Sequence, residues 1–245
     1  KIQIQSSLNK AATISRKFYS VKENDRFSSD FGVFDRKLMS DEEMKAAFPN
    51  FDYYNKTDDL EENLKKATLI HEDLLSIENE ALLFQNAQKV LKPGRYIVEL
   101  KSTEDSLAVY RQSFIVINEK SGKAPAKEML LTYIDNEQVK PGETVAFVFG
   151  SAAEKAQVTV NVKHGNDTRL SKTFTLNNEC NYLKYNVKEE DRGGLTFEAI
   201  IVRHNTCRIE KKTVNVSFDN YRLDLKLSAE RDASLLPGNT EQWSV

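Results

Sequence analysis

The chain has 245 residues, of which 40% are hydrophobic and 29% are charged, and its formal net charge is −2. This length is enough for two domains of ordinary size, and the composition is typical of a folded globular protein. A net charge so close to zero excludes the strongly basic surface that nucleic acid or an anionic membrane would attract, and no apolar run is long enough for a membrane span.

The N-terminal third of the sequence mixes strand and helix patterns. Residues 2–4 and 18–21 read as strands. Ser40 is followed three residues later by Glu43, and this capping-box spacing predicts a short helix, because both side chains can satisfy free backbone N–H groups. Pro49 is expected to end that helix, since proline has no backbone N–H.

Residues 59–91 fit both helical and strand periodicities, and the sequence leaves this choice open. The strand-rich sequence that follows favours at least partial strand here. The acidic cluster at 58–62 is interpreted as a solvated loop or a helix start rather than as a site.

The second half of the sequence reads almost entirely as short strands separated by turns. Apolar, mostly β-branched residues alternate with polar ones, which places the apolar set on one face of a sheet. The strand-like runs lie at 145–149, 158–163, 197–202, 214–218 and 223–227, and the turn-rich breaks lie at 164–167, 177–179 and 191–194. Strands of this length and spacing predict an antiparallel sandwich or barrel.

Three proline–glycine pairs, at 93–94, 141–142 and 237–238, each precede a strand-like stretch. Such a pair suits a type II turn, because proline fixes φ at the first corner and glycine tolerates a positive φ at the second. The pairs at 141 and 237 share their sequence context, and so do the strand starts at 94 and 194. Both landmarks recur after about 100 residues, the size of an immunoglobulin-like sandwich. The aromatic residues after the two strand-start glycines, Tyr96 and Phe197, are expected to be buried there.

These patterns predict an all-β fold of tandem immunoglobulin- or fibronectin-like sandwiches, with a short helical insertion in the first domain. The expected division is a first domain at 1–118, a linker at 119–126, a second domain at 127–218 and the start of a further, incomplete domain at 219–245. The proposed linker is polar and contains Gly and Pro. Because the chain starts at Lys1 and stops at Val245 within strand-like sequence, we interpret it as a piece of a longer protein.

The histidines and cysteines do not form a metal-ligand pattern. His204 and Cys207 are close in sequence, but two ligands are too few for a zinc site, and His71 and His164 stand apart. We expect surface or turn roles for the three histidines. Cys180 and Cys207 could pair in an oxidising compartment, but we favour two separate free cysteines.

Motifs of catalysis are missing from the sequence, which contains no Gly-x-Ser-x-Gly elbow, no Walker loop and no dinucleotide-binding fingerprint. Acids that could be imagined as a glycosidase pair lie in predicted turns, where we expect them to be solvated. These are Asp135, Glu137, Asp167, Glu189, Glu190 and Asp191. Calcium binding at 166–167 or 189–191 stays open, although neither matches an EF-hand loop. The sequence therefore predicts no enzyme, no catalytic residue, no cofactor-binding residue and no metal ligand.

Two groups of aromatic residues offer an alternative reading. Tyr53 and Tyr54 beside Phe51, and Tyr182 with Tyr185, could form a platform on which sugars stack. Core or rim positions of a sandwich are the preferred interpretation.

Several of these segments carry a family resemblance. Residues 130–133 and 139–151, with Pro141 and Gly142, resemble the start of a macroglobulin domain in bacterial alpha-2-macroglobulin-like proteins, especially those of the Bacteroidetes type. Residues 225–243 are similar to the opening of the next such domain, and residues 91–96 resemble the end of the preceding one. The resemblance covers most of residues 85–245.

The resemblance implies a non-catalytic structural segment of a protein that inhibits endopeptidases by trapping them. It also implies export to the periplasm, the outer membrane or the extracellular space, with proteases and neighbouring domains as partners. The Cys-Gly-Glu-Gln thioester of some members is absent, since Cys180 precedes Asn181 and Cys207 precedes Arg208. No thioester residue is carried over, and no bait segment is identified. The alternative function is an exported surface module that binds glycans or another protein.

Overall fold

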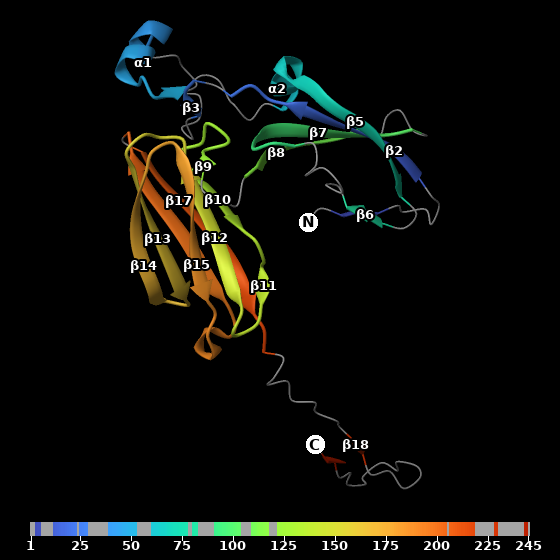
Figure 1. Ribbon diagram of the computed structural model, residues 1–245, viewed down its shortest axis with the longest axis vertical. Helices are drawn as coiled ribbons and strands as arrows, with labels where there is room; N and C mark the ends of the chain where they lie inside the picture. Colours follow the sequence, from blue (N-terminus) through green and yellow to red (C-terminus); the bar gives the residue numbers. More distant parts are fainter. Residues whose placement is uncertain are drawn as a thin grey trace, which may run out of the picture.

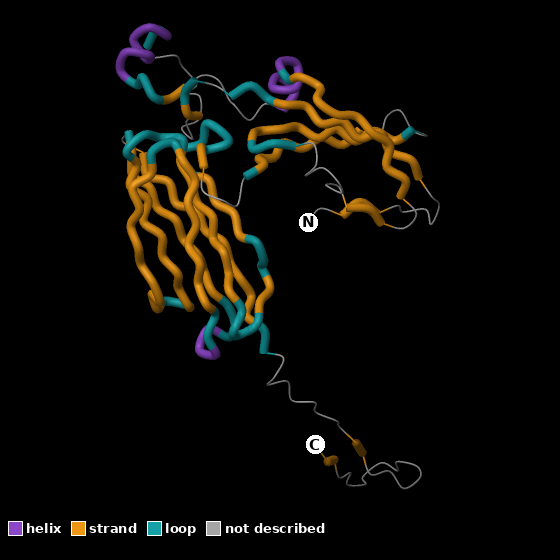
Figure 2. Tube along the Cα trace, in the orientation of Figure 1, coloured by secondary structure: helices purple, strands orange, loops and turns teal. Residues whose placement is uncertain are grey.

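The computed structural model describes residues 3–5, 12–23, 25–28, 39–52, 60–77, 80–82, 91–103, 109–117, 122–204, 206–218, 228–229 and 243–244. Strands dominate these residues and the helices are short, as Figure 2 shows. The all-β prediction is confirmed. The strand predicted at 223–227 and the Pro-Gly pair at 237–238 lie outside the described residues.

Residues 122–218 form a two-layered β-sandwich, which lies on the left of Figure 1. One sheet has the strand order β10-β12-β15-β9, and the other has the order β11-β17-β16-β13-β14. All ladders are antiparallel except the short parallel pair of β11 and β17. The strands are β9 (Gly122–Lys123), β10 (Leu131–Ile134), β11 (Gln138–Val139), β12 (Thr144–Ser151), β13 (Ala156–His164), β14 (Asp167–Leu176), β15 (Glu179–Asn186), β16 (Leu195–Arg203) and β17 (Thr206–Val216).

The sandwich core follows from the two-residue alternation of the sequence. Val158, Val160 and Val162 in β13 are fully buried, whereas the polar residues between them are more exposed. From the facing sheet, Phe147 packs against Phe197 of β16 with 5.4 Å between ring centroids. Each such side chain stabilises the folded state by about 2–3 kcal/mol when it is fully buried. Burial of the apolar residues that alternate along the strands therefore accounts for most of the stability of this core.

A separate four-stranded antiparallel sheet comes before the sandwich in the sequence, and we call it the first sheet. Its order is β5-β2-β7-β8, and a bulge interrupts the pairing of β2 with β5. Its buried core is small in the described residues and centres on Phe18, Val98 and Leu100. The strands are β2 (Ala12–Ser20), β5 (Thr68–Ile77), β7 (Gly94–Ser102) and β8 (Val109–Val116).

The sequence left the secondary structure of residues 59–91 open between helix and strand, and the described part of this stretch contains both. Helix α2 (Leu60–Lys66) is followed directly by strand β5, and residues 83–90 lie outside the description. Glu61 of α2 pairs with Arg111 of β8 at 2.6 Å, which holds the helix near the sheet. The acidic cluster is thus a helix start where it is described, as expected from its charge near the helix N-terminus.

The predicted capping box is confirmed at helix α1 (Asp41–Ala47). The backbone N–H of Glu43 donates to Ser40 Oγ at 3.2 Å, and the Ser40 N–H donates to the Glu43 carboxylate at 2.8 Å. The helix ends just before Pro49, as proline requires. Neither α1 nor α2, the helices of the described chain, is long and apolar enough to cross a membrane.

The remaining elements are short strand pairs and one helical turn. Strand β3 (Phe27–Ser28) pairs in parallel with β4 (Phe51–Asp52). Antiparallel pairs join β1 (Gln3–Gln5) to β6 (Glu80–Leu82) and β18 (Ser228–Ala229) to β19 (Trp243–Ser244). A 3₁₀ turn, η2 (Glu189–Asp191), precedes β16.

Two proline–glycine pairs can be compared with the turn prediction. Gly142 has a φ of +90°, as a type II turn requires, whereas Gly94 already belongs to the extended strand β7. Tyr96 is buried as predicted, and its hydroxyl donates to the Lys92 carbonyl at 2.8 Å, which braces the entry to β7. Phe197 is buried at the equivalent place in β16.

Part of the predicted linker lies against the sandwich. Gly122 and Lys123 form β9 and pair with β15, and the Ala124 N–H donates to the Asn178 carbonyl at 3.1 Å. Ala126 is buried. The domain limits given above stay predictions.

Candidate functional site

An arginine and two glutamates connect the first sheet to the sandwich. Arg95, in β7, donates from Nε to Glu23 at 2.9 Å and from Nη2 to Glu128, which lies shortly before β10. Glu23 also accepts a hydrogen bond of 2.8 Å from the backbone N–H of Lys127. We call Arg95, Glu23 and Glu128 the Arg95 clamp. In Figure 1 the first sheet extends to the right from beside the upper end of the sandwich.

The Arg95 side chain is only 18% exposed in this clamp. Burial by itself would lower the pKa of the guanidinium, but Glu23 and Glu128 outweigh this effect and raise the pKa above its ordinary value. A guanidinium binds two carboxylates through separate N–H groups in fixed directions. The clamp therefore holds the first sheet in contact with the sandwich and also fixes the orientation of one relative to the other.

An apolar contact accompanies the clamp at the same end of the sandwich. Phe27 of β3 and Phe51 of β4 are buried and belong to the core cluster of the sandwich. The ring of His204, in the turn between β16 and β17, lies 6.3 Å from each of their ring centroids. Lys127 Nζ lies 4.6 Å from the Phe27 centroid, a cation–π distance. We call Phe27, Phe51 and His204 the aromatic anchor.

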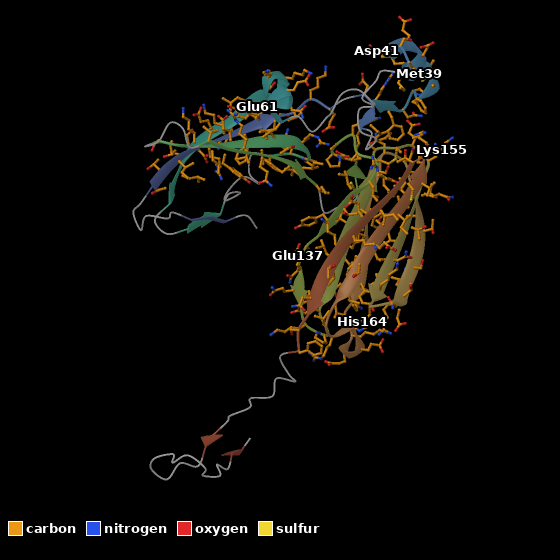
Figure 3. The ribbon with its side chains drawn as sticks, turned by 180° about the vertical axis from the view of Figure 1, so that it is seen from behind. Met39, Asp41, Glu61, Glu137, Lys155 and His164 are labelled. Atoms are coloured by element: carbon orange, nitrogen blue, oxygen red, sulfur yellow. The ribbon has the colours of Figure 1, made fainter. Side chains whose placement is uncertain are left out.

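Figure 3 labels residues at both ends of the sandwich, with Lys155 near the junction and His164 at the opposite end. At that opposite end one expectation was wrong. Asp191 is fully buried rather than solvated, and its Oδ2 accepts hydrogen bonds from the Tyr185 hydroxyl at 3.1 Å and the Lys188 N–H at 2.8 Å. The 3₁₀ turn points Asp191 inward while Glu189 and Glu190 stay exposed.

Asp191 also interacts with Arg169, whose Nε lies 3.6 Å from Asp191 Oδ1. Burial and the nearby Asp191 carboxylate together raise the pKa of Tyr185 to about 12, so the phenol remains a hydrogen-bond donor. This group braces the turn before β16. The other turn acids named above, Asp135, Glu137 and Asp167, are exposed as predicted.

A second buried acid lies on the outer face of the five-stranded sheet. Glu198 is 5% exposed and accepts from Lys163 Nζ at 2.6 Å and from Asn161 Nδ2 at 3.1 Å, and Lys211 Nζ lies 3.3 Å away. The Lys163 hydrogen bond, helped by Asn161 and Lys211, lowers the pKa of Glu198 from 4.5 to about 2. With all partners supplied by neighbouring strands, Glu198 joins β13, β16 and β17 and is not available as a general acid.

The tyrosine pair proposed from sequence does not form a platform. Tyr182 is 42% exposed, whereas Tyr185, three residues along the same strand, is 9% exposed and faces the core. An odd spacing places two residues on opposite faces of a strand. Tyr133, 44% exposed, lies on the same face as Tyr182, two strands away, with Val148 of β12 between them. Tyr53 and Tyr54 lie outside the described residues.

The histidines and cysteines occupy separate places. His71 stacks on Phe18 in the first sheet, and His164 Nδ1 lies 2.9 Å from the Gly194 carbonyl in the sandwich. Cys180 is buried and Cys207 is exposed, and both are free. Within the described ranges, no group of three or more His, Cys, Asp or Glu side chains could hold a metal ion.

Sequence reasoning missed the clamp and the anchor. Their members are far apart in the chain: Arg95 lies 72 residues from Glu23 and 33 from Glu128, and Asn50, which contacts His204, lies 154 residues from it. No local spacing marks such contacts. The one available signal was the burial expected of Phe51, which is an aromatic residue in a mostly polar stretch.

Comparison with known proteins gives distant structural likeness only. No family model and no curated protein matches the sequence. A mutant alpha-2-macroglobulin of Salmonella is similar with a TM-score of 0.34 and 14% identity, over 90% of this chain and 13% of that protein. An Escherichia coli alpha-2-macroglobulin activated by porcine elastase gives a TM-score of 0.29 and 9% identity, over 90% of this chain and 21% of that protein.

A transglutaminase of red sea bream is similar at a still lower TM-score of 0.26, with 6% identity over 88% of this chain and 28% of that enzyme. The chain thus spans a small part of the length of each of these proteins. Because these TM-scores are so low, the fold is described from the strands and the core of this chain alone.

Proposed function

We propose that this chain is a non-catalytic scaffold segment of an exported alpha-2-macroglobulin-like protein that inhibits endopeptidases by trapping them. The sequence resemblance at residues 130–151 and 225–243 supplies the family. The proposal includes the Bacteroidetes type, a periplasmic, outer-membrane or extracellular location, and proteases and neighbouring domains as partners. It also includes the domain limits at 118, 126 and 218.

The observation that carries the scaffold role is a double contact with one end of the sandwich, made by the first sheet and by the β3–β4 pair. The Arg95 clamp fixes the junction through charge-assisted hydrogen bonds, and the aromatic anchor buries Phe27 and Phe51 in the sandwich core cluster. A junction tied by both polar and apolar contacts resists rotation better than a bare linker. A scaffold that transmits a cleavage-driven rearrangement needs joints of this kind.

The test uses the full-length protein incubated with an active endopeptidase and, in parallel, with the same endopeptidase blocked by an active-site inhibitor. Trapping predicts that the active enzyme is retained in a cleaved, more compact complex, visible by small-angle scattering and by co-elution in size-exclusion chromatography. The blocked enzyme should elute separately. If no active protease is retained, the proposed function is wrong.

A second candidate function is a surface module that binds glycans. The observation in its favour is the pair of exposed tyrosines, Tyr133 and Tyr182, on one face of the four-stranded sandwich sheet. A glycan array would compare the unmodified chain with Tyr133→Ala and Tyr182→Ala. Tyr110→Ala, at an exposed tyrosine of the first sheet, is the matched control. Binding that is lost in the first two variants and kept in the control would favour this function.

A further inference from the structure

The aromatic anchor contains a titratable ring in a defined protonation state. Asn50 Nδ2 lies 3.0 Å from His204 Nδ1. An amide nitrogen can only donate, so Nδ1 must accept, and an imidazole accepts only when it is neutral. With the Asn50 amide in this orientation, the contact between the segment that carries β4 and the end of the sandwich is made by an uncharged His204.

A proton on Nδ1 would turn this acceptor into a donor and set it against the Asn50 amide group. Rotation of the amide could restore one hydrogen bond through Oδ1. The charged ring would still pack against both Phe27 and Phe51, at 6.3 Å from each centroid, in a place where water is partly excluded. Burial of an unpaired charge is unfavourable.

The charged groups that act on the ring are cations. Arg203 belongs to the same turn, and Lys127 reaches the anchor from the loop before β10, while Phe27 of β3 and Phe51 of β4 contribute no charge. No carboxylate acts on His204 among the described groups that shift its titration. A proton on this ring would therefore meet repulsion from both sides without compensation.

We propose that His204 is a pH-sensitive latch, which holds the segment carrying β3 and β4 on the end of the sandwich near neutral pH and releases it on acidification. This inference concerns the attachment of one segment and does not depend on protease trapping.

The direction of the pH effect follows from the surroundings of the His204 ring. Burial first, and then Arg203 and Lys127, lower the pKa of His204 below its ordinary value of 6.5. A histidine whose pKa is lower in the attached state than in the released state stabilises attachment above the released-state pKa. Attachment should thus be complete above about pH 7 and should weaken as the pH falls below about 6.5.

The test is amide hydrogen exchange of the whole chain at pH 7.5 and pH 5.5, corrected for intrinsic rates. The reporter is the Phe27 N–H, which donates to the Asn50 carbonyl at 3.0 Å inside the segment, and the reference is the β13 backbone in the sandwich core. Because an isolated pair of two-residue strands is not stable in water, this bond should open when the segment leaves the sandwich. We expect protection at Phe27 to fall about three- to tenfold between the two pH values, since one pH unit below the released-state pKa gives at most about a tenfold change. Protection in β13 should not change.

The decisive variant is His204→Asn. His204 has a positive φ of 49°, which asparagine tolerates well, and the asparagine oxygen offers an acceptor that does not titrate. This variant should keep the protection of Phe27 at both pH values. His164→Asn, at the opposite end of the sandwich, is the matched control and should behave like the unmodified chain.

A second variant keeps the test decisive if His204→Asn folds poorly. Lys127→Met removes one of the two cations near the ring, so the loss of protection at pH 5.5 should become smaller. The latch is disproved if the unmodified chain protects Phe27 equally at both pH values, or if His204→Asn retains the full pH dependence.

Discussion

The sandwich and the first sheet consist of strands of similar length, but they stabilise their buried faces differently. In the sandwich, two sheets face each other and bury aromatic rings such as Phe147, Phe149 and Phe197. In the first sheet, the described core is limited to a few apolar side chains around Phe18, and a fully buried arginine, Arg16, lies among them. The same alternating pattern therefore gives a deep core only where a second apolar layer covers it.

The buried charge of the first sheet has one clear partner. Arg16 binds Asp73 of β5 through two hydrogen bonds, of 2.9 Å from Nε and 2.5 Å from Nη2, and its guanidinium lies 5.0 Å from the Phe18 ring centroid. The pair lies between β2 and β5 and favours their register, because a shifted strand would separate the arginine from this carboxylate. The two regions do not differ in having exposed apolar side chains. Leu74 of the first sheet and Val202 of the sandwich are both 67% exposed.

The largest expected effect comes from the sandwich core. Phe147→Ala should lower the free energy of unfolding of the sandwich by about 4 kcal/mol, because the ring is fully buried and would leave a cavity. Urea unfolding combined with hydrogen exchange measures this effect. Phe18→Ala is the matched change in the first sheet and should accelerate exchange there, with little effect in β13. Equal acceleration in both regions would show that they unfold as one unit.

The next effect depends on pH and belongs to the outer face of the sandwich. The pKa of Glu198 falls from 4.5 to about 2 in the folded protein, so the ionised side chain contributes up to about 3 kcal/mol of stability. Because the folded pKa is the lower one, this contribution is present above about pH 5 and is lost as the pH falls toward 2. Denaturant unfolding should find Glu198→Gln less stable at pH 7 and equal to the unmodified chain near pH 2. A constant difference across this range would contradict the assignment.

A smaller effect tests the buried pair of the first sheet. Asp73→Asn should cost about 2 kcal/mol, because the Arg16 guanidinium would remain buried with a weaker partner, although Asp73 itself is 32% exposed. The double variant Arg16→Met with Asp73→Leu removes both charges and should recover most of the loss. Hydrogen exchange in β2 and β5 gives the measurement. If the double variant is no more stable than Asp73→Asn, the loss does not come from the buried arginine that has lost its carboxylate.

The smallest effect on stability is expected at the junction. Arg95→Gln should cost about 1 kcal/mol, since the clamp is partly exposed. Its local effect should be larger, with faster exchange of the Lys127 N–H that donates to Glu23. Arg111→Gln is the control, because Arg111 of the first sheet also binds two glutamates, Glu99 of β7 and Glu61 of α2, and neither belongs to the sandwich. If the control accelerates exchange at Lys127 equally, the clamp does not hold the junction.

Local sequence rules predicted much of the fold. The alternation of Val158, Val160 and Val162 gave the core face of β13, and Ser40 with Glu43 gave the start of α1. These features depend on side chains two or three positions apart, so a single strand or turn contains all the information. The stretch at 59–91 resisted this reasoning because Leu60–Lys66 and Thr68–Ile77 adopt different structures with only Ala67 between them.

The candidate site was less predictable because its contacts join residues that are far apart in the sequence. Asp191 was expected in solvent because acids in turns usually are, but the turn places its carboxylate under Tyr185. Tyr182 and Tyr185 are close in sequence, but the pleat of the strand places them on opposite faces, and strand pairing puts Tyr133 on the same face as Tyr182.

The sequence by itself determined the class of fold, several strands of the sandwich and the cap of α1, because hydrophobic alternation and backbone chemistry act over a few residues. Only the tertiary structure decided which charged side chains of the described residues are buried, namely Arg16, Asp191 and Glu198, and which distant residues meet at the junction. A charged side chain can be buried only where another strand supplies its partner, and strand pairing joins residues that no local pattern connects.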